Sequence, residues 1–322
     1  MAWKAAARAA LHNMGGLAAL RLVNRRRFRV LAFHSFSEAS WANVEAICDH
    51  ISGHFEPLSL TDLVDAIKRG VPLPDHALAI TVDDGYRNYA LHGHPIFRRH
   101  KIPITLFVVS GFAAGRLWLW PDQIEFGLER ASKVSIPIRL GAEEAELPLS
   151  SSQHKADSIA RLTEMLKAVP NRQRLAFMEG FGDLCAVEIP VAPPPPCSAM
   201  NWDDLRAVAS EGVEIGCHTE THPILTRLES PADLEREVKG AKESLEASLG
   251  LPIRHFCYPN GKAPDIDDAV VAAVADAGFD SAVTCFWGLN ANTVPPLRIQ
   301  RLPFDSALEF NYAVELLAGL HL

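Results

Sequence analysis

The sequence predicts an α/β fold in which a mainly parallel sheet or barrel alternates with helices. The first observation is a set of short, continuous apolar runs typical of buried parallel strands, at residues 30–33, 77–82, 104–109, 213–217, 255–258 and 282–285. The second is helical spacing of apolar residues between these runs, at residues 42–51, 60–69, 95–100, 202–210, 231–249 and 266–277. Strands that alternate with helices in this way indicate a parallel arrangement.

The alternation fades between about residues 117 and 197. This stretch holds three expected helices, at residues 121–131, 154–168 and 172–178, and ends in a proline-rich linker. We interpret it as a helical insertion with too little apolar periodicity for an independent domain. The predicted organisation is an N-terminal arm of residues 1–29, then one barrel over residues 30–322 that carries the insertion and closes with a helix at 304–317.

Composition and charge exclude several classes of protein. Of the 322 residues, 48% are apolar and 22% are charged, as in ordinary soluble enzymes. No apolar run reaches the ~18 residues that a spanning helix needs. The net charge of −8 argues against a general nucleic-acid binder. The six cysteines form no C-x-x-C pattern, so we expect reduced and mostly buried thiols.

The first 29 residues form a basic arm. They contain seven of the 31 lysines and arginines and none of the 39 acidic residues. A helix is expected at residues 3–14, and the arm predicts contact with an anionic membrane surface. The alternative is a solvated terminus that has no partner. Because this segment is a poor signal peptide, we expect a cytoplasmic protein, peripheral at the membrane where the arm binds it.

Three polar clusters each follow a predicted strand, at the end where α/β barrels carry their active sites. The first contains the adjacent carboxylates Asp83 and Asp84, for which the alternative is a surface Asp-Gly turn. The second contains His218 and His222, four apart as on one helical turn, and histidines at this spacing can share a metal ion. Two unrelated surface histidines are the alternative. The third, residues 254–261, leads from Arg254 through a strand to a Pro-Asn-Gly turn at the strand end. Its arginine can hold a carboxylate ionised, and the alternative is a plain strand followed by a turn.

Together the clusters resemble the motifs of one family, the polysaccharide deacetylases (carbohydrate esterase family 4, with a NodB-type domain). Residues 81–85 resemble the T-F-D-D-G motif, with Val82 in place of phenylalanine, and residues 218–222 resemble the H-[ST]-x-x-H motif. Residues 254–259 resemble a variant of the third motif, an arginine followed by a proline-containing turn. The order agrees as well, and the resemblance covers roughly residues 30–300 outside the insertion.

The resemblance implies a distorted (β/α) barrel with fewer than eight regular units. It also implies that Asp84, His218 and His222 bind one divalent metal ion, and we expect Zn²⁺. Such an ion polarises the acetamide carbonyl and lowers the pKa of its water.

The resemblance further implies the roles of three residues around the reacting carbonyl. Asp83 is the expected general base, and Arg254 is expected to orient it. The backbone N–H of Tyr258 is expected to help hold the oxyanion.

The general acid departs from the usual pattern of the family. Typical members carry it as a histidine in a Leu-x-x-His-like motif near the C-terminus, whereas residues 297–303 contain no histidine here. His34 ends the first predicted strand, and in rearranged members of the family such an N-terminal strand supplies the acid. We therefore hypothesise that His34 is the general acid. A structural histidine at a strand end is the alternative.

Aromatic side chains near the motifs are candidates for a sugar-binding groove. They are Tyr258 and four tryptophans, Trp118, Trp120, Trp202 and Trp287, and core packing is the alternative for each. Trp118 and Trp120 begin the insertion, which can form a lid over the substrate.

The expected function is metal-dependent removal of N-acetyl groups from an N-acetylated glycan or lipid-linked sugar in cell-surface polysaccharide assembly. Two alternatives stay open. One is an amide or imide hydrolase for a small substrate that is not a sugar, and the other is an inactive glycan-binding relative.

Overall fold

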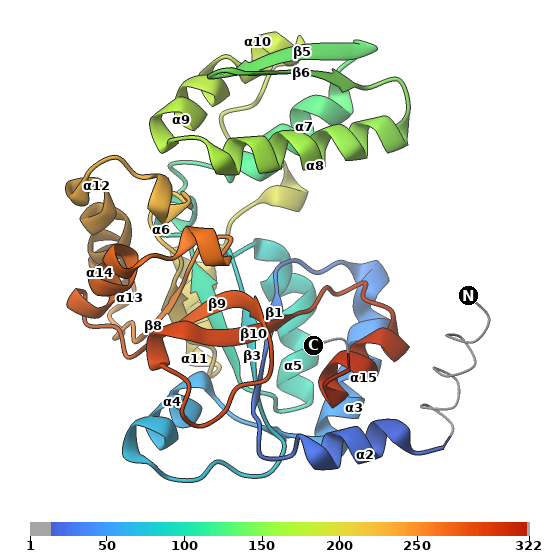
Figure 1. Ribbon diagram of the computed structural model, residues 1–322, viewed down its shortest axis with the longest axis vertical. Coiled ribbons are helices and arrows are strands. Elements are labelled where there is room, and N and C mark those ends of the chain that lie inside the picture. The colour runs from blue at the N-terminus through green and yellow to red at the C-terminus, as the bar shows by residue number, and fades with distance from the viewer. Residues whose placement is uncertain (1–13, 321–322) are drawn as a thin grey trace.

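The computed structural model describes residues 14–320 (Figure 1). Seven parallel strands close into a barrel in the order β1-β10-β9-β8-β7-β4-β3, and β3 pairs back with β1. The short strand β2 (Glu56–Pro57) adds to the start of β3. The bounds of the barrel strands are β1 (Arg29–Phe33), β3 (Ala77–Val82), β4 (Ile104–Val108), β7 (Glu214–Cys217), β8 (His255–Cys257), β9 (Ser281–Trp287) and β10 (Ile299–Pro303). An α/β barrel is therefore the fold, one of the two arrangements that the apolar runs predict.

The six predicted strands are confirmed, and their continuous apolar runs have a simple cause. Every residue of β1, β3 and β4 is buried, because the barrel interior covers one face and the surrounding helices cover the other. Strand β10 was not predicted, since Gln300 and Arg301 interrupt its apolar run. Arg301 is nevertheless fully buried, and β10 lies between β1 and β9, where it closes the barrel.

The predicted helices of the barrel are also confirmed. Ser59 caps α4 by accepting a hydrogen bond from the Asp62 amide, and Gly70 ends that helix in the left-handed conformation with φ of 66°. The segment predicted as one helix at 231–249 contains a five-residue π turn, Arg236–Gly240. The helices outside the insertion are α2 (Gly16–Val23), α3 (Trp41–His54), α4 (Leu60–Arg69), α5 (His94–Arg99), α6 (Ser110–Ala113), α11 (Trp202–Ser210), α12 (Pro231–Glu235), α13 (Ala241–Leu249), α14 (Asp268–Asp276) and α15 (Phe310–Ala318). The closing helix thus begins six residues later than expected.

The described part of the predicted arm is packed against the barrel. Leu17 of α2 contacts Val314 and Ala318 of α15. Arg29 belongs to β1, and its buried guanidinium donates hydrogen bonds to the carbonyls of Leu317 and Arg27, both at 2.7 Å. The helix expected at residues 3–14 lies almost entirely outside the described residues.

Within residues 14–320, no helix has the length and apolar character required to span a membrane.

The insertion forms a small layer with its own hydrophobic core. Its elements are α7 (Trp120–Arg130), the hairpin of β5 (Ser135–Leu140) and β6 (Glu143–Pro148), α8 (Ser152–Ala168), α9 (Asn171–Glu179) and α10 (Phe181–Cys185). The three predicted helices are confirmed, whereas the acid-rich hairpin was not predicted. In Figure 1 this layer lies beyond one end of the barrel, the end at which the chain leaves β4. A separate cluster around Leu162 and Phe181 fills its interior.

We expect Phe181→Ala to destabilise the insertion by about 3–5 kcal/mol, because it removes a fully buried ring from a core that does not extend into the barrel. Denaturant unfolding followed by hydrogen exchange should show the insertion opening before the barrel strands do. Val191→Ala, at a side chain exposed to 99%, is the matched control and should leave the unfolding curve unchanged. A single transition at the wild-type midpoint in Phe181→Ala would contradict a separate core.

Candidate metal and catalytic site

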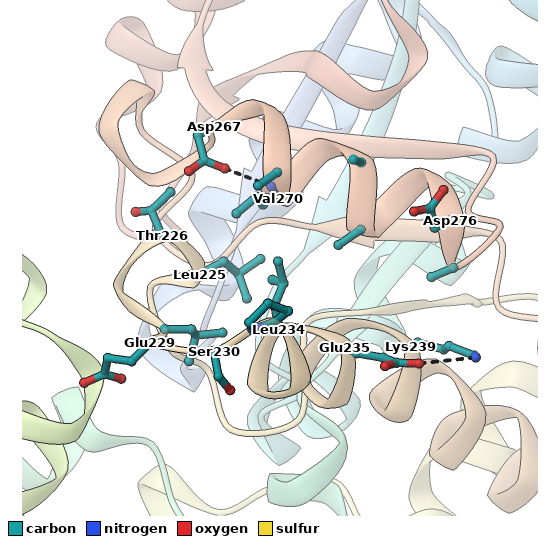
Figure 2. Close-up of a pocket in the computed structure, with 16 residues that line it drawn as sticks. Leu225, Thr226, Glu229, Ser230, Leu234, Glu235, Lys239, Asp267, Val270 and Asp276 are labelled. Carbon is teal, nitrogen blue, oxygen red and sulfur yellow. Dashed lines mark hydrogen bonds and ion pairs between the residues drawn. The ribbon is translucent and has the colours of Figure 1, made fainter.

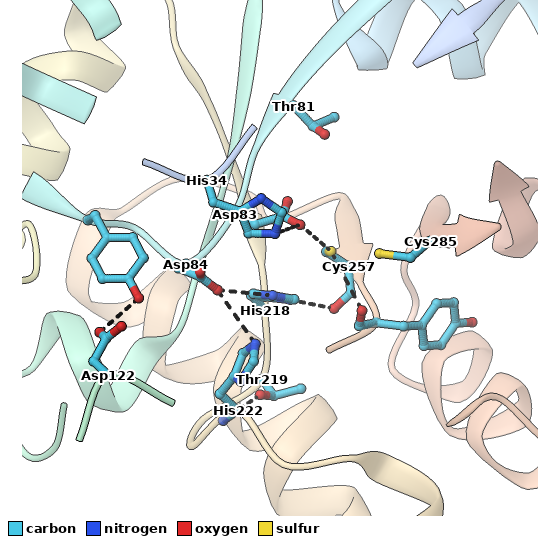
Figure 3. Close-up of polar contacts among 12 residues, drawn as sticks. His34, Thr81, Asp83, Asp84, Asp122, His218, Thr219, His222, Cys257 and Cys285 are labelled. Atoms are coloured by element: carbon cyan, nitrogen blue, oxygen red, sulfur yellow. Dashed lines mark hydrogen bonds and ion pairs between the residues drawn. The ribbon is translucent and has the colours of Figure 1, made fainter. Parts of the chain in front are cut away.

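The first two polar clusters and His34 converge at the carboxyl ends of the barrel strands (Figure 3). Asp83 and Asp84 follow β3, His218 follows β7, and His34 follows β1. In parallel barrels the carboxyl ends of the strands lie on the same face, so residues distant in sequence meet there.

Asp84, His218 and His222 form a cation-sized cluster. Nε2 of His218 lies 3.4 Å and Nε2 of His222 lies 3.5 Å from Oδ1 of Asp84. Nδ1 of His218 donates to the Cys257 carbonyl at 2.8 Å. Because a carbonyl can only accept, Nδ1 carries a proton, and Nε2 points toward Asp84. Burial lowers the pKa of His218, but the hydrogen bond to Asp84 and the nearby carboxylates outweigh it and raise that pKa, and when the ring is neutral its lone pair is on Nε2. This is the tautomer that a metal ligand requires.

Two further observations fit a divalent metal at this cluster. Oδ1 of Asp84 is buried and has no hydrogen-bond partner, although a buried carboxylate oxygen is costly to leave unpaired. Burial lowers the pKa of His222 to about 3, so its ring is neutral and can ligate. Two imidazole nitrogens and one carboxylate oxygen are a donor set that suits Zn²⁺ and leaves positions open. The residues present therefore fit the expected ion.

The spacing of the two histidines predicts a helical turn, but the loop that carries them, residues 218–222, is irregular. Thr219 and His222 have φ values of 69° and 57°, which bring the two rings to 4.9 Å between centroids. Such backbone costs roughly 1–3 kcal/mol per residue and needs support. Oγ1 of Thr219 accepts from the His222 amide at 3.0 Å. The buried carboxylate of Glu237 accepts from the amides of Glu220 and Thr221 at 3.0 and 2.8 Å.

Asp83 forms a buried ion pair with Arg301. Nη1 and Nη2 of Arg301 donate to Oδ1 and Oδ2 of Asp83 at 2.7 and 2.8 Å, and both side chains are almost fully buried. Nε of Arg301 also donates to the Thr284 carbonyl at 2.9 Å. Burial alone would raise the pKa of Asp83, but the guanidinium outweighs it and holds that pKa well below its usual range. Asp83 is therefore a fixed, ionised carboxylate.

The prediction that Arg254 orients Asp83 is wrong. Arg254 precedes β8, at the amino end of the barrel, and its guanidinium binds Asp65 at 2.5 Å and Asp280 at 2.6 Å. Arg301 takes the expected position instead. Sequence reasoning missed it because β10 was not recognised, although an arginine flanked by apolar residues at 299 and 302 is the available signal.

The prediction that the Tyr258 amide holds an oxyanion is also wrong. This N–H donates to the Val283 carbonyl at 3.2 Å as part of the pairing of β8 with β9. The ring is buried, and its hydroxyl donates to the Leu297 carbonyl at 3.1 Å. Neither donor of Tyr258 faces the metal cluster.

His34 lies beside the carboxylate of Asp83, as Figure 3 shows. Its Nε2 is 3.7 Å from Oδ2 of Asp83, and its side chain is 53% exposed. The ring is thus at the open side of the site, where an incoming molecule can reach it.

Trp118 and Trp120 are core residues, and their prediction as sugar-stacking faces is wrong. Each is only 4% exposed. The Trp118 ring packs edge-on against Phe126, and the Arg174 guanidinium lies over the Trp120 ring. Nε1 of Trp120 donates to the His222 carbonyl at 3.2 Å. Trp120 therefore connects the insertion to the loop that carries His218 and His222.

The other two tryptophans differ in exposure. Trp202 begins α11, is half-buried and packs against the barrel core. Trp287 ends β9, is 57% exposed, and lines a pocket with His34. Of the four tryptophans, Trp287 alone offers an open ring face next to the site.

Tyr86 and Asp122 were not predicted as site residues, yet Tyr86 follows Asp84 by two residues in the chain and Asp122 lies on the Asp84 side of the site in Figure 3. The Tyr86 hydroxyl donates to Oδ2 of Asp122 at 2.8 Å. Burial raises the pKa of Asp122 to about 7. Because Asp122 belongs to α7, this hydrogen bond is a second link between the insertion and the site.

A cavity of about 650 Å³ lies between α12 and α14 (Figure 2). Leu225, Leu234 and Val270 line it, and it shares no residue with the metal cluster or the Asp83–Arg301 pair. It therefore forms no part of the candidate site.

Comparison with known proteins gives one family and several structures. Residues 193–282 match the family described as polysaccharide deacetylase, a range that contains both histidines of the metal cluster. No curated protein sequence matches the chain.

Three solved structures share the fold across nearly the whole chain. The Streptococcus pyogenes deacetylase PplD in complex with acetate is 13% identical, with a TM-score of 0.57 over 90% of this chain and 98% of that one. IcaB from Ammonifex degensii is 16% identical, with a TM-score of 0.56 over 91% and 97%. The BpsB deacetylase domain from Bordetella bronchiseptica is 17% identical, with a TM-score of 0.53 over 87% and 96%. The family match and the shared barrel together confirm the resemblance of this chain to the polysaccharide deacetylases.

Proposed function

We propose that this protein hydrolyses N-acetyl groups on an N-acetylated glycan or lipid-linked sugar, with a divalent metal ion, expected to be Zn²⁺, at Asp84, His218 and His222. The observation that carries the proposal is the position of an ionised carboxylate, Asp83, directly beside an unsatisfied Asp-His-His cluster. The deacetylase names of the structures with the same fold support the reaction class. A glycan of the cell surface is the substrate that the family resemblance implies.

The chemistry divides between the metal and the side chains of the chain. The ion, when bound, supplies Lewis-acid polarisation of the amide carbonyl. Asp83 accepts the proton of the attacking water, and Arg301 keeps its carboxylate ionised and oriented for this task.

His34 is the proposed proton donor to the departing amine. It lies on the open side of Asp83, within reach of a leaving group that points to solvent. A short path also exists for the proton that Asp83 receives, since Nε2 of His34 is 3.7 Å from its carboxylate. Amide hydrolysis requires such a donor, because the amine leaves poorly as an anion.

Metal removal should abolish acetate release from an N-acetylglucosamine oligomer, and added Zn²⁺ should restore it. We expect one ion per chain in mass spectrometry, lost in His222→Ala but retained in the exposed control His154→Ala. A glycan that binds without acetate release, with metal present, would instead indicate the inactive relative. Acetate release only from small amides would indicate the non-sugar hydrolase.

Arg301→Lys should reduce kcat/KM at least about 100-fold, since a single ammonium cannot hold both oxygens of Asp83. The acid limb of the pH profile should move to higher pH, because a weaker partner no longer holds the pKa of Asp83 so low. Arg254→Lys is the matched control and should retain activity near the wild-type level. Equal losses in both variants would contradict the assignment of Arg301.

His34→Ala should lower kcat by about 10²–10⁴-fold while metal content is unchanged. Hydrolysis of 4-nitrophenyl acetate should fall much less, because its leaving group departs without a proton. Wild-type activity on the amide in His34→Ala, with metal bound, would exclude this residue as the acid.

A further inference from the structure

A second pocket opens beside the catalytic residues. Its volume is about 360 Å³, within the range of roughly 300–1,000 Å³ typical of pockets that hold whole small molecules. It lies at the carboxyl ends of β1, β9 and β10 and extends to α15. The lining residues that matter here are His34 and Arg301 at the catalytic end and Trp287, Phe304, Leu308 and Tyr312 beyond them.

We propose that this pocket holds the acyl chain of an N-acyl substrate and that it accepts chains longer than acetyl. This inference rests on the proposed amide hydrolysis and specifies its substrate. An acetyl group ends in a single methyl, which would leave most of the pocket unfilled.

The chemistry of the walls selects an apolar ligand. Ala32, Trp287, Phe304 and Leu308 contribute apolar surface. The Arg301 guanidinium is bound to Asp83 and to the Thr284 carbonyl, so its donors do not serve the pocket.

Asp305, the acidic residue of the wall, is exposed to solvent, and one of its oxygens is engaged. Its Oδ1 accepts a hydrogen bond from the Ala307 amide at 2.7 Å. A sugar ring placed here would bury several hydroxyls with few partners, which costs free energy, whereas a hydrocarbon chain would not.

The position of the pocket indicates which part of the substrate enters it. The amide carbon must lie within reach of both Asp83 and His34, and His34 lines the pocket. Two groups extend from that carbon, the nitrogen that carries the polar remainder and the acyl chain. The nitrogen must lie near the exposed face of His34 to receive its proton, so the acyl chain is the group left to point inward.

The test compares N-acetyl-, N-butyryl- and N-hexanoylglucosamine oligomers with the intact, metal-loaded protein. Each buried methylene should raise kcat/KM about threefold. The hexanoyl chain has four more methylenes than acetyl, so complete burial corresponds to about 80-fold, and burial of half of them to about tenfold, the smallest gain that supports the pocket. Leu308→Trp should fill the pocket and remove this preference, with hexanoyl hydrolysis falling far more than acetyl hydrolysis. Leu308 lies in the loop before α15 and is half-buried, so the fold should tolerate the change. Leu251→Trp, at an exposed loop residue, is the matched control.

Cys285 gives a second readout that requires no turnover. It lines the pocket and is half-exposed, and Cys197 is a half-exposed reference outside the pocket. Hexanoate should slow alkylation of Cys285 at least about threefold relative to acetate at equal concentration, with Cys197 unaffected.

The two readouts distinguish failure of this inference from failure of the proposed function. Acetyl hydrolysis without a preference for hexanoyl, or equal losses for both substrates in Leu308→Trp, would overturn the acyl pocket and leave the proposed function intact. If no amide is hydrolysed, the proposed function fails, and absence of hexanoate protection at Cys285 would overturn the pocket as well.

Discussion

The buried pairing of Asp83 with Arg301 is the interaction on which both the barrel and its chemistry depend. A charge in a barrel interior is tolerated only when it is paired and its remaining hydrogen-bonding capacity is used. Arg301 meets this requirement through Asp83, the Thr284 carbonyl and the hydroxyl of Thr81, so one side chain of β10 contacts both β3 and β9. The pair therefore links β3, β9 and β10. It also keeps the carboxylate of Asp83 ionised in a buried position.

Much of the fold could be predicted because a strand that is buried on both faces consists almost entirely of apolar residues. Strands such as β3 and β4 are uninterrupted apolar runs. Strand β10, which closes the barrel, is not a continuous apolar run, because Arg301 is buried with an ion-pair partner instead of an apolar side chain. The hairpin of β5 and β6 was missed for the opposite reason, because its exposed edge is rich in acidic residues such as Glu143 and Glu144.

The candidate site divides in the same way. Metal ligands have narrow chemistry and short spacing, so Asp84, His218 and His222 could be selected from the sequence and are adjacent in the structure. The partner of Asp83 could not be selected, because every arginine can pair with a carboxylate. Only the order of the strands determines which arginine lies next to Asp83. The same limit applies to Trp118, whose residue type is compatible with a sugar platform and with a core.

The hydrogen bond from Trp120 to the His222 carbonyl has a consequence for regulation of the site. The insertion has its own core, so it can respond as a unit to a molecule that binds it. Because Trp120 belongs to the insertion and His222 to the metal cluster, a shift of the insertion would change the geometry of the loop at residues 218–222. If a ligand of the insertion changes metal affinity by some factor, then the metal changes the affinity for that ligand by the same factor. An insertion joined in this way would then bind its ligand with an affinity that depends on whether the metal is bound.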